Sequence, residues 1–450
     1  MKRFLALAAV LLLLAPVSVR AEAQAITEVV SPGGIKAWLR QDTSVPLIAI
    51  EFQFHGTGLV PPEKAGTETM AARMLMEGAD IWDAESFRQA LADNAIGLSF
   101  EAGRDGFHGS MTTLTANRTM AVRLLGAALT EAKFDESSLR QQKARLVAER
   151  RRSEAQPNAL AYRNWFRLAY EGHPYGQTVR GTAGTAAAIE LDDVRTYLDQ
   201  ILTRRNLTIG VAGDISPSEL GVLLDDVFGD LPDHEPPAEI PPAPEPPPGL
   251  AVIPHPSPQS VVVFGHAGIP REDPDWYPAL VVTQILGGSS FSSRLGEEVR
   301  EKRGLAYGIG AGLASYEAGA VLLGRTATRN DAVAEALSVI EAEWRRLAEE
   351  GPTAGELADA KSYLIGSYPI SLDSTDAIAA ALVDMQIAGL PRDYWSKRAE
   401  VISAVDRQAA GRVAKRLLKA EALLTVVVGT PEGLSPTLSA PAVPSPVEGD

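Results

Sequence analysis

The sequence contains no cysteine among its 450 residues. Disulfide bonds are therefore excluded, and so is any metal site built on thiolates. The folded chain must rely on side-chain packing alone for its stability.

Basic residues are too few for a nucleic-acid-binding protein. Lys and Arg number 42 against 57 Asp and Glu, which gives a formal net charge of −15. Binding to phosphates requires a basic surface that displaces counterions, so this balance argues against a nucleic-acid partner. The densest basic run, at 150–152, stands in a charged helical stretch and is interpreted as a solvated face.

Long apolar runs are missing after the first residues. Lys2 and Arg3 precede an apolar stretch at 4–17, and small residues lead up to Ala21. This stretch is shorter than the roughly 20 residues that cross a bilayer, and the pattern is typical of a secretory signal. We predict a signal peptide over 1–21 and a soluble mature protein in the periplasm of a bacterium.

Common catalytic motifs are also absent. The sequence has no P-loop and no G-x-S-x-G elbow, and its histidines never recur at i,i+3 or i,i+4 as paired ligands on a helix would. We interpret all of them as turn-forming or hydrogen-bonding residues. They are His55, His108, His173, His234, His255 and His266.

A proline-rich segment divides the chain. Residues 231–249 show neither helix nor strand periodicity and predict an extended linker. Because a chain of this length exceeds one core of ordinary size, we expect an N-terminal domain over 26–230 and a C-terminal domain over 250–432. Residues 433–450 are predicted to form a loose tail.

The two parts read as distant repeats. Alternating apolar residues at 48–54 predict a strand with one buried face, followed by a loop, an apolar helix, a second helix and two strands. The same order recurs from residue 260, and the segments 206–220 and 423–434, each a late strand running into a turn, correspond as well. Strands interleaved with long helices, with hairpins between them, indicate an α+β protein.

The segment GTGLVPPEKAG and the following TETMAARMLMEGAD (56–80) resemble the inverted zinc motif of the insulinase/pitrilysin family, in which a helix carries His-x-x-Glu-His. Two histidines four residues apart share one helix face and bind zinc, and the glutamate activates its water. The resemblance aligns these positions with Thr69, Ala72 and Arg73. None of the three retains the required group.

The family's third zinc ligand is a glutamate on a later helix, and the alignment places it at Glu149 in RLVAERRR. An ordinary surface glutamate is the alternative interpretation. We predict that Arg73 occupies the place of the metal and forks onto Glu149, because a guanidinium offers a permanent charge and five donors.

The segment VREKRGLAYGIG resembles the second half of the family's enzymes, where an Arg and a Tyr assist the catalytic centre. Arg300 and Tyr307 match in type and in spacing. The resemblance implies that they hold the substrate backbone and the oxyanion of the tetrahedral intermediate. The alternative is that Arg300 serves the helix dipole and Tyr307 fills the core.

The resemblance covers nearly the whole mature chain and implies two tandem homologous domains. Each is expected to be a mixed, mainly antiparallel sheet with helices on one face. Some family members work as heterodimers in which one subunit carries zinc and the other the Arg/Tyr pair, as in bacterial pairs and the mitochondrial processing peptidase. The resemblance therefore implies a subunit without its own catalytic residues, metal or cofactor. A zinc-bearing homologous partner would then supply the metallopeptidase activity on peptides or unfolded segments.

Two alternatives remain open at this point. The core subunits of the cytochrome bc1 complex resemble the family without being peptidases, so the chain could be a structural or peptide-binding scaffold. A peptidase active by itself would need a metal site that the sequence does not show.

The acidic composition predicts long-range steering of basic peptides, weakened by screening beyond roughly 8 Å.

Overall fold

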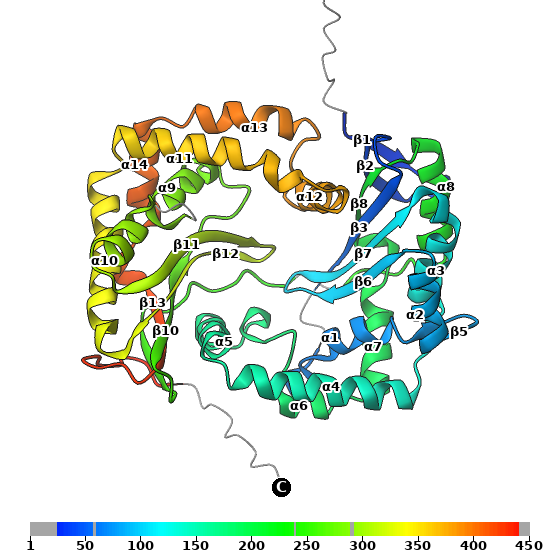
Figure 1. The fold of residues 1–450 in the computed structure, drawn as a ribbon, viewed down its shortest axis with the longest axis horizontal. Helices are drawn as coiled ribbons and strands as arrows, with labels where there is room; N and C mark the ends of the chain where they lie inside the picture. Colours follow the sequence, from blue (N-terminus) through cyan, green and yellow to red (C-terminus); the bar gives the residue numbers. More distant parts are fainter. Residues whose placement is uncertain (1–24, 57–59, 238–239, 289–291, 441–450) are drawn as a thin grey trace, which may run out of the picture.

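The computed structural model describes residues 25–56, 60–237, 240–288 and 292–440. The chain forms two halves, each built on one large sheet with helices packed against it (Figure 1). The predicted signal peptide lies outside the described residues. Within these residues no helix is both long and apolar enough to cross a membrane.

The sheet of the first half has six strands in the order β1-β2-β8-β3-β7-β6. β2 and β8 are parallel, and the other neighbours are antiparallel. The strands are β1 (Thr27–Val30), β2 (Lys36–Gln41), β3 (Leu47–His55), β6 (Gly97–Ala102), β7 (Gly106–Leu114) and β8 (Leu207–Gly213), and a separate short pair is formed by β4 (Gly78–Ala79) and β5 (Trp82–Asp83).

The sheet of the second half has five strands in the order β11-β12-β10-β13-β9. Here β13 and β9 are parallel and the other neighbours antiparallel. The strands are β9 (Gly249–Pro254), β10 (Gln259–Ala267), β11 (Ala306–Tyr316), β12 (Gly319–Arg329) and β13 (Leu424–Gly429). Read from the hairpin edge, both sheets repeat the same connectivity, apart from the additional β1.

A detail of packing shows the same repeat. Phe52 on β3 pairs across the ladder with Gly109 on β7, and Phe264 on β10 pairs with Gly324 on β12. A Cβ on Gly109 would lie 2.1 Å from the Phe52 ring, and one on Gly324 would lie 2.4 Å from the Phe264 ring. Each ring therefore lies over a glycine that has no room for a side chain. The predicted fold class, two α+β repeats with mixed and mainly antiparallel sheets, is confirmed.

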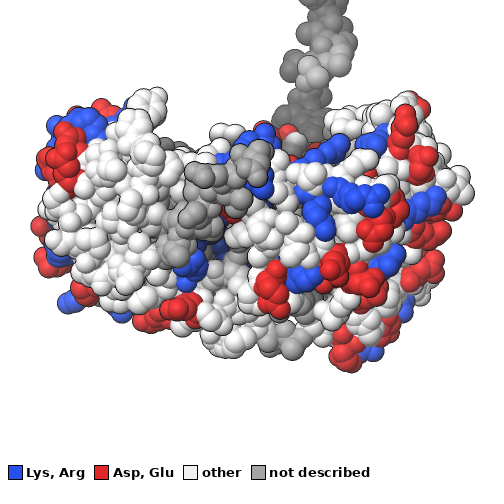
Figure 2. Space-filling model, turned by 90° about the horizontal axis from the view of Figure 1, so that it is seen from below, with Lys and Arg blue, Asp and Glu red and all other residues white. Residues whose placement is uncertain are grey.

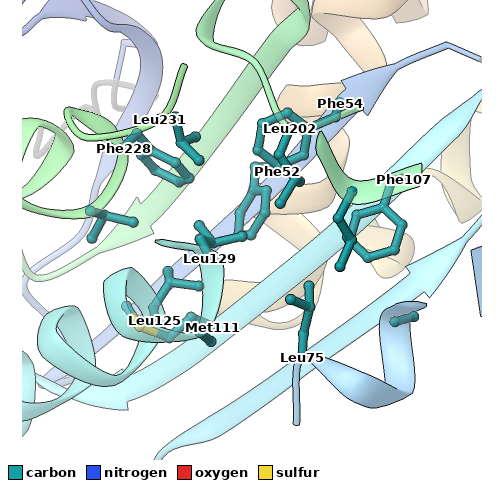
Figure 3. Close-up of a cluster of buried hydrophobic side chains, with 14 of the residues drawn as sticks. Phe52, Phe54, Leu75, Phe107, Met111, Leu125, Leu129, Leu202, Phe228 and Leu231 are labelled. Carbon is teal, nitrogen blue, oxygen red and sulfur yellow. The ribbon is translucent and has the colours of Figure 1, made fainter. Parts of the chain in front are cut away.

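Helices cover one face of each sheet with their apolar sides, and the buried residues form one core per half. In the first core, aromatic residues of β3 and β7 meet leucines of α3 and of the segments that follow α1 and α7 (Figure 3). The helices of the first half are α1 (Thr67–Met74), α2 (Ala84–Asp93), α3 (Arg118–Thr130), α4 (Glu136–Glu154), α5 (Pro157–Ala169), α6 (Ala183–Ala187), α7 (Leu191–Ile201) and α8 (Pro217–Phe228). Those of the second half are α9 (Trp276–Gly287), α10 (Val333–Glu350), α11 (Ala354–Ser367), α12 (Thr375–Ile387), α13 (Tyr394–Ser403) and α14 (Arg407–Leu417).

The opposite face of each sheet is covered by a helix from the other half (Figure 1). α5 packs on β13 and β10, where the Trp165 indole N–H donates to the Leu424 carbonyl over 2.9 Å. α12 packs on β8 and β3, so closely that a Cβ on Gly210 would lie 2.3 Å from the Ala379 carbonyl. α5 belongs to the predicted N-terminal domain by sequence but to the second sheet by packing. Because α5 and α12 cross reciprocally, each half buries a second sheet face that its own helices leave open.

The turn between β11 and β12 also joins the halves. The Tyr175 hydroxyl donates to an Asp105 carboxylate oxygen at 2.5 Å and accepts from the Ala318 N–H at 2.8 Å. His55 Nδ1 lies 2.5 Å from a Glu317 carboxylate oxygen. The turn is thereby tied to β3 and to the β6–β7 turn.

The described part of the proline-rich segment has no helix or strand before β9 and is held by hydrogen bonds on both sides. The Ala243 N–H donates to the Ala318 carbonyl at 2.7 Å, and His173 Nε2 lies 2.9 Å from the Pro241 carbonyl. The beginning of the predicted tail is held as well, because the Leu438 N–H donates to the Leu250 carbonyl. This segment closes the edge next to β9; residues 441–450 lie outside the described residues.

Candidate functional site

The three degenerate motif positions lie on α1, which begins after Gly66 in the left-handed region, at φ 103°. The Thr69 hydroxyl donates to the Val179 carbonyl at 2.8 Å and is engaged in holding the 176–181 segment. Ala72 is buried, with 5% of its surface exposed. Arg73 lies one residue further along and reaches towards α4.

The Arg73 guanidinium forms a bidentate ion pair, called the fork below, with the Glu149 carboxylate. Nη1 lies 3.3 Å from one carboxylate oxygen and Nη2 lies 2.5 Å from the other. The Arg73 hydrogen bond is the largest cause of a lowered pKa of the Glu149 carboxyl, reinforced by the charges of Arg73, Arg150 and Arg152. The predicted contact between Arg73 and Glu149 is confirmed, and Glu149 is more than an ordinary solvated glutamate.

These residues do not fit a zinc ion. The three aligned positions offer a hydroxyl already used by a backbone carbonyl, a methyl group and a cation, so Glu149 would remain as the single anionic ligand. Divalent zinc needs at least three protein ligands of the His, Cys, Asp or Glu type. Across the described ranges, no group of three such side chains is arranged to hold a metal.

Glu68, next to the motif, is a buried carboxyl that the sequence interpretation missed. Burial raises its pKa to about 7, although two backbone N–H groups, those of Glu68 and Gly66, oppose the shift. One of its oxygens is buried without a hydrogen-bond partner in the described part of the chain. Burial, and then the charge of Glu68, raise the pKa of Tyr197 on α7. An acid in the first turn of a helix is ordinarily a solvated partner of the helix dipole, so only the packing of α7 on α1 reveals this burial.

Arg300 and Tyr307 are brought together in the second half. Arg300 lies in the short π-helix Gly296–Glu301, and the left-handed Gly304 (φ 59°) turns the chain back into β11. The Arg300 guanidinium carbon lies 5.4 Å from the centre of the Tyr307 ring, a cation–π distance. Tyr307 is 91% exposed, so it does not fill the core as the alternative required. The role in substrate binding stays a prediction.

The Arg300–Tyr307 pair and the α1 site lie apart within the chain. The first half contacts β11 at its far end, through Glu317, whereas Tyr307 lies at the beginning of that strand. Nine residues of extended chain between Tyr307 and Tyr316 correspond to roughly 30 Å. Any catalytic centre that the pair serves would therefore have to reach this end of the second half.

A cavity of about 1180 Å³ lies between the halves. Its walls come from β3, the β11–β12 turn, α9 and α12, and they combine aromatic rings with more acids than bases. The acids are Asp105, Glu272, Glu317 and Asp384, and the aromatic residues are Trp276, Tyr316, Tyr368 and Tyr394. Burial raises the pKa of both Asp105 and Asp384. The cavity is large enough for several side chains of an extended peptide.

A further acidic contact lies where α12 crosses the first sheet. Burial and the nearby charges of Asp376 and Asp384 raise the pKa of Glu51 on β3 to about 7. The Thr112 hydroxyl donates to Asp376 in the same contact. The docking of α12 is therefore sensitive to the protonation of Glu51.

Five of the six histidines make the hydrogen bonds predicted for them. Their partners are Glu317 and Thr208 for His55, Pro241 and Tyr175 for His173, Glu235 and Asp199 for His234, Ala155 for His255, and Ala267 and Trp344 for His266. Burial lowers the pKa of His108.

Known proteins share this sequence pattern and architecture. Residues 188–364 match the family model described as the peptidase M16 inactive domain. A relative described as a non-peptidase homolog, YmxG of Helicobacter pylori (strain ATCC 700392 / 26695), is 24% identical over 406 residues, covering 88% of this chain and 90% of its own. An uncharacterized zinc protease, YmxG of Bacillus subtilis (strain 168), is 27% identical over 266 residues, which cover 59% of this chain. The chain spans 64% of the length of that Bacillus relative.

Solved structures agree with these relatives. The crystal structure of a peptidase M16 inactive domain from Pseudomonas fluorescens superposes with a TM-score of 0.85 at 25% identity, covering 92% of this chain and 99% of that one. A chain of complex III2 from Candida albicans superposes with a TM-score of 0.75 at 16% identity, covering 90% of this chain and 96% of its own. The second likeness concerns the fold.

Proposed function

We propose that this chain is the non-catalytic, substrate-binding subunit of a heterodimeric zinc peptidase. It belongs to the M16 peptidases, the insulinase/pitrilysin-type family, and its residues 188–364 match their inactive domain. The proposed partner is a zinc-bearing homologue, and the proposed substrates are peptides or unfolded segments. The basic and apolar beginning of the sequence supports export, so the proposed compartment is the periplasm.

The observation that carries this proposal is the contrast between the two sites. On α1 a guanidinium forks onto Glu149 where the family's enzymes hold zinc, so this half is unsuited to activate water. In the second half, Arg300 and Tyr307 are side by side, and the phenol projects into solvent. An exposed phenol contributes little to folding, so its placement favours a role towards a bound molecule or a partner.

In this proposal the pair acts on a reaction centred in the partner. A guanidinium and a phenolic hydroxyl are fixed donors that can hold a substrate carbonyl and the negative charge that develops on its oxygen. Arg300 orients the phenol through the cation–π contact. The large cavity between the halves would hold the flanking residues of the substrate.

The test is cleavage of a fluorescence-quenched unfolded peptide by the chain alone, by its zinc-bearing homologue alone, and by the mixture. Activity confined to the mixture, and lowered at least tenfold by Arg300→Ala or Tyr307→Phe, is the expected result. Arg329→Ala is the control, since Arg329 is an exposed arginine of the second half paired with Asp331. Melting temperatures of all variants should remain close to that of the wild type. Zinc and activity in the lone chain would overturn the proposal.

A structural or peptide-binding scaffold is the second candidate. The fold likeness to a chain of complex III2 and the relative described as a non-peptidase homolog both support it. In this case the mixture shows no activity beyond that of the zinc-bearing homologue. Unchanged behaviour of Tyr307→Phe would point the same way.

A further inference from the structure

A pocket of about 360 Å³ lies beside the α1 site, between the end of α4, the beginning of α5 and residues 176–181. Four arginines line it and one carboxylate opposes them. The arginines are Arg104, Arg150, Arg163 and Arg180, and the acid is Glu154. On the face seen in Figure 2, Lys and Arg lie mainly on the right side, interspersed with Asp and Glu, while the left side is largely uncharged apart from its rim.

The described residues neutralise the positive charge of the pocket only in part: Arg180 pairs with Glu101 at 3.1 Å, where both side chains are exposed. Arg150 has its Nε buried without a partner and forms no ion pair with any described residue. Burial, and then the charge of Arg180, lower the pKa of Arg150. Glu154 lies 3.6 Å from Arg163 and already accepts from the Ala183 N–H at 2.9 Å. Among the described lining residues, Glu154 is thus the one carboxylate beside four guanidinium groups.

The remaining wall is partly apolar and is held by contacts of Arg104. The Arg104 guanidinium lies 3.7 Å from the centre of the Phe166 ring and donates to the Tyr175 carbonyl at 2.5 Å. Phe166 is buried, while Tyr162 is 43% exposed and lines the pocket. A short aliphatic stem that ends in an anion fits such a combination of ring faces and guanidinium groups.

The pocket borders the residues that align with the zinc motif. The Val179 carbonyl, in the pocket lining, accepts the Thr69 hydroxyl of α1 at 2.8 Å. Arg150 directly follows Glu149, the residue forked by Arg73. A peptide that passes α1 would therefore bring a neighbouring group within reach of the arginines.

We propose that this arginine pocket binds a carboxylate of the bound peptide, either an Asp or Glu side chain or the C-terminal carboxylate. The inference rests on the proposed peptide-binding function and names the class of group that the chain selects. It differs from the prediction from net charge, which favours basic peptides. At the pocket the four local guanidinium groups determine which charge is preferred, because interactions at contact distance are screened far less than the field of the whole chain.

The experiment measures the affinity of the mature chain for short peptides by isothermal titration calorimetry. One pair of peptides, capped at both ends, differs by Glu against Gln at a single position. A second pair lacks acidic side chains and differs by a C-terminal carboxylate against an amide. A lysine-containing peptide completes the set. The two pairs distinguish the two sources of the carboxylate without any change to the protein.

We expect about tenfold tighter binding of one carboxylate peptide over its neutral counterpart, as for a charge-assisted hydrogen bond. Arg150→Gln and Arg163→Gln should remove this preference and leave the affinity for the neutral peptide unchanged. Arg151→Gln and Arg167→Gln are the matched controls, because both are exposed, lie on the same helices and do not line the pocket. The controls should retain the preference.

The outcomes separate this inference from the proposed function. Peptide binding without a carboxylate preference, or with a preference for lysine, overturns the pocket and leaves the substrate-binding role intact. Failure of every peptide to bind overturns both. A preference that survives Arg150→Gln and Arg163→Gln in folded variants also overturns the pocket, because another cationic group would then carry it.

Discussion

Replacing Arg73 by methionine removes the guanidinium that joins α1 to α4 and keeps a flexible chain of similar length. The fork to Glu149 has two short contacts, at 3.3 and 2.5 Å. We expect the single variants Arg73→Met and Glu149→Gln each to lower the free energy of unfolding, since either change leaves the other group without its partner. The double variant should lose less than the sum of the two.

The expected coupling energy between Arg73 and Glu149 follows from the exposed fractions of their side chains. The two side chains are 26% and 37% exposed, so the pair is neither fully solvated nor fully buried. Exposed ion pairs contribute about 0.2–1 kcal/mol, and breaking a buried pair costs about 3–5 kcal/mol. For a bidentate pair with this exposure we expect a coupling energy of about 1–2 kcal/mol.

The assay is a double-mutant cycle from urea unfolding, followed by tryptophan fluorescence at neutral pH. The matched control is the pair Arg345 and Glu341 on α10, whose side chains are 55% and 46% exposed. A pair at that spacing on an exposed helix face should couple by about 0.3–0.5 kcal/mol. Repeating both cycles at low pH adds a second readout.

The sign of the pH effect is fixed by Glu149. Arg73 lowers the pKa of this carboxyl in the folded chain below its ordinary value of 4.5. The stabilisation is therefore complete above that ordinary value and is lost as the pH falls through the folded-state pKa. A coupling energy no larger than that of the control pair, or one that persists in strong acid, would refute the view that the fork stabilises the contact between α1 and α4.

Three further predictions concern other parts of the molecule. The folded-state pKa of Glu51 is raised to about 7, so the free energy of unfolding should fall by about 1 kcal/mol, after allowing for partial exposure, as the pH rises from about 4.5 to 7. Glu51→Gln should remove this fall. If the variant unfolds with the same pH profile as the wild type, the prediction is wrong. Trp165→Ala should cost about 3–5 kcal/mol in urea unfolding, because the buried indole holds α5 on the second sheet; a loss below about 1 kcal/mol would contradict this packing. The triple variant Thr69→His, Ala72→Glu, Arg73→His should bind zinc, and mass spectrometry of the purified protein should detect the bound ion. The wild type should carry no zinc. A metal-free triple variant would argue against the alignment of the motif.

Several features were predictable because they depend on local periodicity. Alternation at 48–54 placed β3, and the recurrence of the same pattern from residue 260 placed β10 and the second repeat. The fork between Arg73 and Glu149 was also predictable, although the two residues are 76 apart, because the family resemblance linked them. The burial of Glu68 was not, since nothing in the first turn of a helix indicates what packs against it.

The sequence by itself determined the order of helices and strands and the repeat, because both depend on residues that are neighbours or follow a fixed period. The loss of the zinc ligands at Thr69, Ala72 and Arg73 stays a prediction from the family resemblance. Only the tertiary structure decided that α5 and α12 cross to the opposite sheets, that Arg300 meets an exposed Tyr307, and that four arginines from four separate segments share one pocket. Such groupings arise from packing between elements far apart in the chain, and side-chain burial and local charge depend on that packing.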